Sequence, residues 1–93
     1  MKKYFLELSS RAEKDIEAYI KSGEKKKLER IYSFFEELEQ HPETGTGKPK
    51  RLKHEFAGCW SRRIDDKNRL VYKINDDIVI VTIVAARNHY TDR

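Results

Sequence analysis

The chain has 93 residues and a mass of 11.1 kDa, which suffices for one domain spanning residues 1–93 and excludes a large multi-domain enzyme. Charged residues make up 39% and hydrophobic residues 38%, so we expect a folded domain with a small core. The single cysteine, Cys59, excludes an internal disulfide, and the apolar run near the N-terminus is too short for a signal peptide or membrane span. We therefore expect a cytoplasmic protein with no membrane partner.

The formal net charge is +4, and the positive excess lies in one window. Residues 48–69 hold eight basic and three acidic side chains, whereas the rest of the chain is close to neutral. Such a window indicates a polyanion partner. A solvated surface that keeps a small protein soluble explains the same charge, so both interpretations stay open at this point.

The N-terminal half predicts a short strand and two helices. Residues 4–8 alternate in polarity as a strand does, and Ser9 and Ser10 can cap a helix that ends at Gly23. A second amphipathic helix is predicted from Lys25 to Gln40, before Pro42. The short turn between them predicts a hairpin of helices, and the glycine-containing residues 43–50 predict a loop.

The C-terminal half predicts three antiparallel strands at residues 60–64, 69–74 and 78–86, separated by polar turns. Leu70 and Tyr72 are expected to face the helices, which displays Arg69 on the opposite face of the sheet. The predicted fold is α+β: an N-terminal strand and a two-helix hairpin packed on a four-stranded antiparallel sheet.

Arginines in these strands are candidates for binding phosphate. Arg62 and Arg63 are neighbours in a strand and point to opposite faces, so at most one of them can share a site with Arg69. A guanidinium presents a fork of donors that suits a phosphodiester. An ion pair with Asp65 or Asp66 is the competing explanation for these arginines.

His89 and Tyr90 follow the most apolar strand. Histidine transfers protons near neutral pH, and tyrosine offers a hydroxyl and a stacking surface, although simple surface residues would look the same. The three histidines, His41, His54 and His89, are too widely spaced to predict a metal site, and no cofactor is expected.

Several sequence blocks together resemble the YoeB (Txe) branch of the RelE/ParE toxin superfamily. They are Gly47-Lys48-Pro49, Leu52-Lys53-His54, residues 58–64 around Trp60-Ser61-Arg62-Arg63-Ile64, Asn68-Arg69-Leu70-Val71-Tyr72 and His89-Tyr90. The resemblance covers nearly the whole chain in order and length. It implies a RelE-like fold and the toxin of a bacterial type II toxin-antitoxin pair.

The resemblance also implies an activity and its residues. Such a toxin enters the ribosomal A site and cleaves messenger RNA without a metal ion, because the ribose 2′-hydroxyl attacks its neighbouring phosphate and leaves a 2′,3′-cyclic phosphate. By position, His89 matches the family's general acid, Arg69 its transition-state arginine, Arg63 a second phosphate-contacting arginine and Tyr90 its terminal aromatic residue. Four further cations would suit messenger or ribosomal phosphates: Lys48, Arg51, Lys53 and Arg62.

Lys50 departs from the family pattern, which places a glutamate general base directly after Gly-Lys-Pro. A lysine is normally protonated at pH 7 and is a poor base. Glu43 or Glu55, His89 or the ribosome could supply the base. Our hypothesis is that Lys50 stabilises negative charge while the ribosome positions the substrate.

The resemblance further implies a YefM-like antitoxin as partner, the ribosome and messenger RNA as targets, and promoter DNA only through the antitoxin. It also suggests a homodimer. Two other functions stay open: a gyrase-directed toxin, against which the terminal His89-Tyr90 argues, and an antitoxin-binding co-repressor with weak or no nuclease activity.

Overall fold

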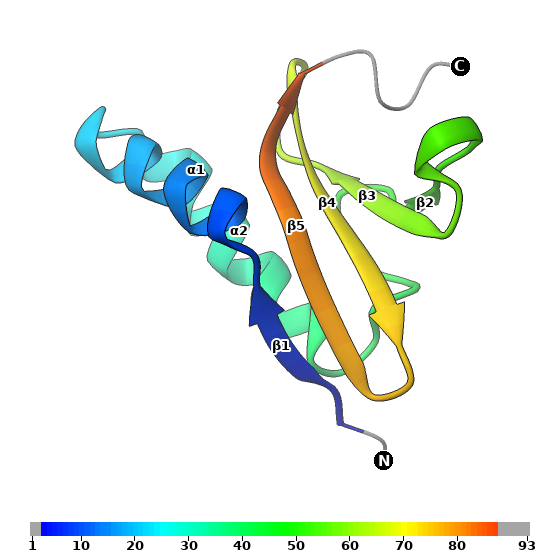
Figure 1. Cartoon of the computed structure of the whole chain (residues 1–93). Helices are drawn as coiled ribbons and strands as arrows, with labels where there is room; N and C mark the ends of the chain where they lie inside the picture. Colours follow the sequence, from blue (N-terminus) through cyan, green and yellow to red (C-terminus); the bar gives the residue numbers. More distant parts are fainter. Residues whose placement is uncertain (1–2, 88–93) are drawn as a thin grey trace.

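The computed structural model describes residues 3–87, with the backbone alone for Glu55 and residues 85–87. Figure 1 shows two helices packed against one side of a twisted sheet. This arrangement confirms the predicted α+β class. Within these residues no helix is long and apolar enough to cross a membrane. In chain order the elements are β1 (Phe5–Leu8), α1 (Ser10–Lys21), α2 (Lys25–Leu38), β2 (Lys50–Arg51), the 3₁₀ helix η1 (His54–Phe56), β3 (Cys59–Arg63), β4 (Asn68–Asn75) and β5 (Ile78–Arg87).

The helical hairpin forms as its local sequence predicts. Ser9 caps α1, because its Oγ accepts a hydrogen bond from the Ala12 amide at 3.0 Å. Gly23 adopts a φ of +73° between the helices, a conformation that favours glycine. The helix α2 ends at Leu38, two residues before its predicted end. The buried residues of the two helices point toward the sheet: Ala12, Ile16, Tyr19, Ile31, Phe34 and Leu38.

The sheet differs in two respects from the four antiparallel strands that were predicted. The described residues form five strands in the order β1-β5-β4-β3-β2, and β1 runs parallel to β5 while the other neighbours are antiparallel. The helical hairpin returns the chain to the sheet and allows the parallel pairing, which has no local sequence signal. The additional strand, β2, has only two residues and is too short to produce an alternating pattern.

The main core lies between the helices and one face of the sheet. Leu70 and Tyr72 of β4 are fully buried there, as predicted. Register shifts between β4 and β5 change the alternation of β5, so that Val81 and Val84 both face the helices although they are three residues apart. This irregularity explains how one long apolar strand contributes to both faces of the sheet.

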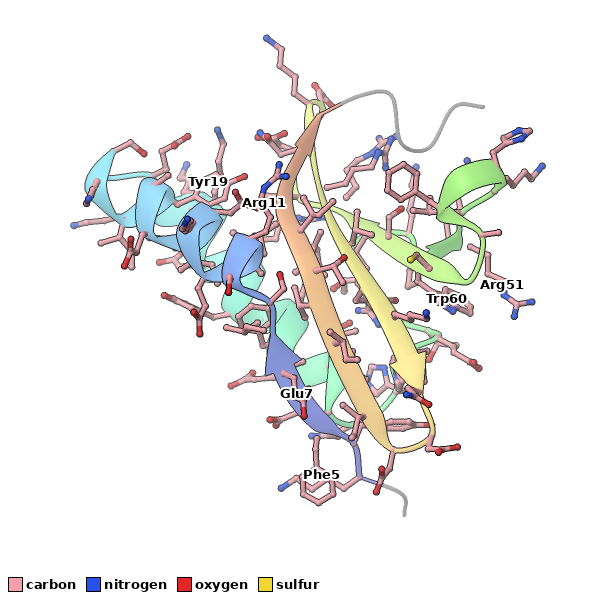
Figure 2. All side chains as sticks on the ribbon, in the orientation of Figure 1. Phe5, Glu7, Arg11, Tyr19, Arg51 and Trp60 are labelled. Atoms are coloured by element: carbon pink, nitrogen blue, oxygen red, sulfur yellow. The ribbon has the colours of Figure 1, made fainter. Side chains whose placement is uncertain are left out.

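The other face of the sheet carries a smaller apolar cluster. Leu52 and Val71 are buried in it, and Phe56, Cys59 and Ile83 pack around them. Figure 2 shows the side chains on both faces, with Phe5 at the N-terminal end of β1 and Arg51 close to Trp60 beside β2. The end of β3 and the start of β4 extend beyond this cluster and carry two of the predicted site residues, Arg63 and Arg69.

Candidate functional site

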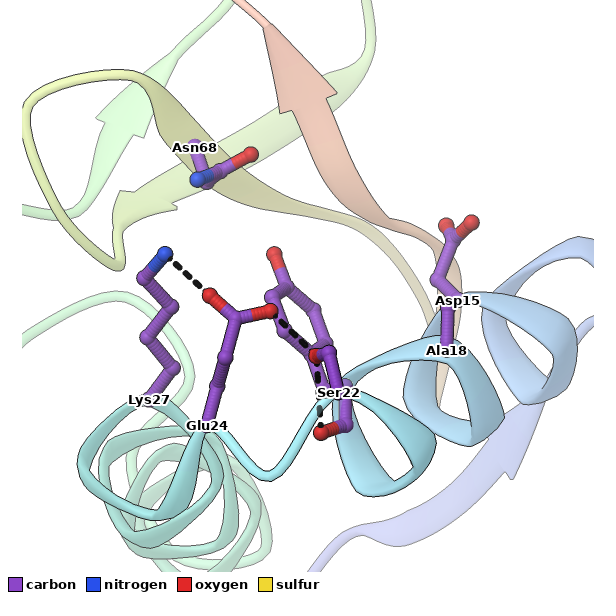
Figure 3. Close-up of a pocket in the computed structure, with 7 residues that line it drawn as sticks. Asp15, Ala18, Ser22, Glu24, Lys27 and Asn68 are labelled. Carbon is purple, nitrogen blue, oxygen red and sulfur yellow. Dashed lines mark hydrogen bonds and ion pairs between the residues drawn. The ribbon is translucent and has the colours of Figure 1, made fainter.

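A pocket of about 290 Å³ lies on the helix side of the sheet, between α1, the start of α2 and β4 (Figure 3). Its polar groups are already engaged: Glu24 binds Ser22 at 2.6 Å and Lys27 at 2.5 Å, and the Tyr19 hydroxyl donates to the Val84 carbonyl at 3.2 Å. Burial raises the pKa of Tyr19 to about 12, so this phenol is neutral and a poor base near pH 7. The pocket contains none of the predicted site residues.

The predicted arginines meet on the opposite face. Arg63 of β3 lies directly across from Arg69 of β4 in the antiparallel ladder, so both side chains project from the same side of the sheet. Their Cβ atoms are therefore about 5 Å apart. Both side chains are partly exposed, and no ion pair joins either of them to an acidic side chain within the described residues. Two facing cations without an acidic partner form a natural anion site.

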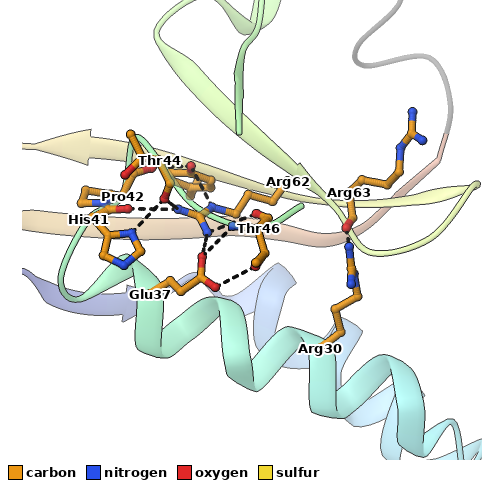
Figure 4. Close-up of polar contacts among 9 residues, drawn as sticks. Arg30, Glu37, His41, Pro42, Thr44, Thr46, Arg62 and Arg63 are labelled. Atoms are coloured by element: carbon orange, nitrogen blue, oxygen red, sulfur yellow. Dashed lines mark hydrogen bonds and ion pairs between the residues drawn. The ribbon is translucent and has the colours of Figure 1, made fainter. Parts of the chain in front are cut away.

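The main chain of Arg63 is held from outside the sheet. Its N–H donates to the Gly47 carbonyl at 2.7 Å, and its carbonyl accepts a hydrogen bond from Arg30 of α2 at 3.1 Å. Figure 4 shows Arg30 reaching the backbone of Arg63 while the Arg63 side chain extends away from α2. Both hydrogen bonds fix the position from which the guanidinium projects.

Lys50 lies on the same face as the arginine pair. It is opposite Ser61 in the ladder between β2 and β3, and Ser61 is two residues before Arg63. The Ser61 hydroxyl and the Arg63 Nε are buried and have no hydrogen-bond partner among the residues described. Unsatisfied buried donors are rare in proteins. Here both of them lie on the face that carries Lys50, Arg63 and Arg69.

Arg62 has a different place from the one predicted. Its side chain is 0% exposed and lies on the helix side of the sheet, where it binds Glu37 and surrounding carbonyl groups (Figure 4). A guanidinium held in this way cannot contact RNA phosphates. The expectation for Arg62 is therefore corrected: in the alternating strand, this arginine is directed into the core and its neighbour Arg63 outward.

The other predicted cations lie in or beside β2. Arg51 is opposite Trp60, on the side facing away from Lys50, and its guanidinium lies 5.6 Å from the centre of the Trp60 ring. Lys48 and Lys53 are exposed in the segments on either side of β2. Lys73 is an exposed residue of β4 on the same face as Arg69, and it was not among the predicted site residues because it lies outside the basic window.

His89 and Tyr90 lie outside the described residues. The strand that precedes them, β5, ends at Arg87, which pairs with Asn68 next to Arg69. Of the carboxylates considered as bases, Glu43 is exposed in the loop between α2 and β2.

Comparisons with known proteins agree with this fold. The family described as YoeB-like toxin of bacterial type II toxin-antitoxin system matches residues 9–90. Toxin YoeB of Mycobacterium bovis is 45% identical over 69 residues, 74% of this chain and 79% of that protein. Toxin YoeB of Escherichia coli K12 is 39% identical over 72 residues, 77% of this chain and 83% of that protein.

Two solved structures extend the similarity to the fold. The YoeB dimer from Staphylococcus aureus superposes with a TM-score of 0.79 at 27% identity, over 95% of this chain and 99% of that one. The toxin in the heterotetrameric YoeB-YefM complex of the same organism gives a TM-score of 0.77 at 27% identity, over 94% and 98%. This chain belongs to the family of YoeB-like toxins of bacterial type II toxin-antitoxin systems, which confirms the resemblance.

Proposed function

We propose that this toxin is a ribosome-dependent endoribonuclease that cleaves messenger RNA in the A site and thereby inhibits translation. The observation that carries the proposal is the pair of facing arginines, Arg63 and Arg69, which has no acidic partner in the described part of the chain. Each guanidinium can donate two parallel hydrogen bonds to phosphate oxygens. Two of them together match the extra negative charge of a phosphorane transition state.

In this mechanism the RNA supplies its own nucleophile. The 2′-hydroxyl gives its proton to a base supplied by the ribosome or by solvent and attacks the adjacent phosphorus, the bond to the 5′-oxygen breaks, and the products end in a 2′,3′-cyclic phosphate and a 5′-hydroxyl. His89 protonates the leaving 5′-oxygen and Tyr90 contacts the reacting nucleotides. The arginines stabilise the charge, so the proposed reaction needs no metal ion.

Lys50 takes the role of a cation rather than a base in this proposal. It lies on the same face as the arginine pair, opposite Ser61, and a protonated amine at this place stabilises charge on the phosphate. With no carboxylate at position 50, substrate alignment contributes more of the rate. The ribosome holds the messenger in a fixed path. Positioning of this kind can lower the activation barrier of a reaction by about 7 kcal/mol or more.

The exposed cations around this face would hold the RNA backbone and the ribosome. Lys48, Lys53 and Lys73 are all exposed, and Lys73 is four residues along β4 from Arg69, a distance of about 13 Å. Cations at this spacing can contact successive phosphates of a single strand. Binding through them should weaken as the salt concentration rises.

We further propose a YefM-like antitoxin as the partner that neutralises this toxin. The Staphylococcus aureus relative is found with YefM in a heterotetramer, and as a dimer in another structure. An acidic, partly disordered antitoxin segment would complement the positive charge on the face that carries Lys50, Arg63 and Arg69. Promoter DNA would be contacted only through the antitoxin, and a homodimer of the toxin is part of the same proposal.

The proposal is tested by primer extension on a messenger with translating ribosomes present and absent. We expect a cut at the A-site codon only in the presence of ribosomes. His89→Gln should abolish the cut and leave antitoxin binding unchanged. Absence of any ribosome-dependent cut would overturn the proposal, and inhibition of gyrase or antitoxin binding without cleavage would favour the two alternative functions.

The chemistry is tested separately with a messenger that carries a 2′-deoxy nucleotide immediately before the scissile phosphate. If the 2′-hydroxyl is the nucleophile, this messenger should resist cleavage, while the unmodified messenger should yield a 2′,3′-cyclic phosphate. Cleavage of the 2′-deoxy messenger would instead mean that water or a side chain attacks the phosphate.

A further inference from the structure

The buried guanidinium of Arg62 uses every one of its donors. Its five N–H groups correspond to five hydrogen bonds. Nε donates to the Tyr72 hydroxyl at 3.3 Å, Nη1 donates to Glu37 and to the Thr46 carbonyl, and Nη2 donates to the carbonyls of His41 and Thr44 at 3.1 and 2.8 Å. A lysine has only three donors at a single point and cannot reproduce this fork.

Most of the acceptors belong to one loop, residues 41–49, which joins α2 to β2. Figure 4 shows the carbonyl groups of this loop arranged around the guanidinium. Glu37 closes the arrangement from α2, because its carboxylate also accepts hydrogen bonds from the Thr46 amide at 3.0 Å and the Thr46 hydroxyl at 2.7 Å. The Tyr72 hydroxyl adds a bond to the Pro42 carbonyl at 2.6 Å.

The same loop leads directly to the face of the sheet that carries Lys50, Arg63 and Arg69. Gly47 packs against Phe34 and accepts the hydrogen bond from the Arg63 amide. Lys48 follows with a φ of +52°, a conformation that a lysine adopts only where its surroundings impose it. Lys50 then enters β2 opposite Ser61. The conformation of the loop thus decides where Lys48 and Lys50 lie relative to Arg63.

We propose that Arg62 is a positioning residue for the nuclease site: by holding residues 41–49 it places Lys50 on the face of the sheet that carries Arg63 and Arg69. This inference rests on the proposed function for its activity but not for its structural part. A buried ion pair is a weak source of stability, since apolar residues of similar volume often serve as well. A device that specifies one loop conformation explains better why a charge is buried here.

The structural part is tested by amide hydrogen exchange in Arg62→Lys, with Arg11→Lys as the matched control. Arg11 is exposed and pairs with Asp15 on α1, far from the loop in sequence. In Arg62→Lys we expect the amides of Thr46 and Arg63 to exchange at least tenfold faster, while the core amide of Val81 changes less than twofold. Unchanged exchange at Thr46 and Arg63, or equal acceleration at Val81, would overturn the inference.

The activity part uses Arg62→Lys, Lys50→Ala and the double variant, with single-turnover cleavage of ribosome-bound messenger as the readout. Arg62→Lys should lower the cleavage rate about tenfold with less than a twofold change in ribosome affinity. In the Lys50→Ala background, Arg62→Lys should lower the cleavage rate less than twofold. Equal losses in both backgrounds, or full activity of Lys50→Ala, would overturn the inference. If the unaltered chain does not cleave, the proposed function fails while hydrogen exchange still decides the role of Arg62.

Discussion

Arg63 and Arg69 face each other across two antiparallel strands, on the side of the sheet that the helices leave uncovered. Like charges in directly opposite positions destabilise a sheet, by about 0.2–1 kcal/mol for a typical pair. Such a pair is expected where the function requires a bound anion, because the anion removes the repulsion between the two guanidinium groups. The arrangement therefore links the stability of the protein to what it binds.

Arg69→Gln should stabilise the free protein, because it removes the repulsion with Arg63. The expected rise in melting temperature is roughly 1–8 °C for a domain of this size. Sulfate or phosphate should raise the melting temperature of the unaltered chain more than that of the variant. Lys73→Gln is the control, since it removes one exposed charge from the same face. Equal effects of both substitutions would show that the arginine pair has no special repulsion.

Lys50→Glu should lower cleavage of messenger RNA on ribosomes. A charge-assisted hydrogen bond contributes about 1.5–3 kcal/mol, so its loss corresponds to roughly a 10- to 150-fold lower rate. The measurement is single-turnover cleavage with antitoxin affinity determined in parallel. A gain of activity would instead mean that a carboxylate base is better at this position and that Lys50 is not part of the chemistry.

Gly47→Ala should be more destabilising than Gly23→Ala, although both glycines have a positive φ. A Cβ at Gly23 would meet no atom within 4 Å, so the cost is the strained backbone alone, about 1–2 kcal/mol. A Cβ at Gly47 would lie 2.6 Å from the Phe34 ring and must displace it or the loop. Urea unfolding of the two variants measures the difference. Equal losses would mean that the loop moves away without cost.

Acidification should destabilise the protein in part through Glu37. Burial of this carboxyl raises its pKa, but hydrogen bonds from Thr46 and Arg62 outweigh burial and hold the pKa below its usual range. Its contribution is therefore present above the ordinary carboxyl pKa of about 4.3 and is lost as the pH falls through the lower folded value. Asp65, whose pKa is also lowered, acts in the same direction.

The contribution of Glu37 to stability is measured by comparing the melting temperatures of the unaltered chain and Glu37→Gln from about pH 7 down to about pH 3. The variant should be less stable at neutral pH and should lose less stability on acidification. Parallel curves for the two proteins would show that the Glu37 carboxylate does not support folding.

Local patterns predicted much of this fold. Ser9, Gly23 and Pro42 delimit the helices, and the alternation of β4 places Leu70 inward and Arg69 outward as expected. The parallel pairing of β1 and the register shifts of β5 were not predictable, because both depend on contacts between segments far apart in sequence. The two-residue β2 is too short to carry any pattern.

The site was predictable in the same uneven way. Family resemblance matched Arg63, Arg69 and Lys50 to functional positions, and strand alternation placed Arg69 on the face away from the helices. Lys50 was expected in a loop, and its place on the face of Arg63 follows only from the pairing of β2 with β3. Alternation also showed that Arg62 points away from Arg63, but a basic residue in a basic window suggested a surface cation. Its partner Glu37 lies 25 residues earlier, on α2, and only the folded structure brings the two together.

The central claim is that Arg63 and Arg69 hold the scissile phosphate of a messenger bound to the ribosome. It is tested most directly by single-turnover cleavage of one messenger, on programmed ribosomes and free in solution, by the unaltered chain and by Arg69→Gln. We predict that the unaltered chain cleaves the messenger only when it is bound to ribosomes. Arg69→Gln should cleave it at a rate at least 100-fold lower, about the loss caused by removing one donor that stabilises a transition state. Equal rates for the two proteins, or equal cleavage with and without ribosomes, would contradict the claim.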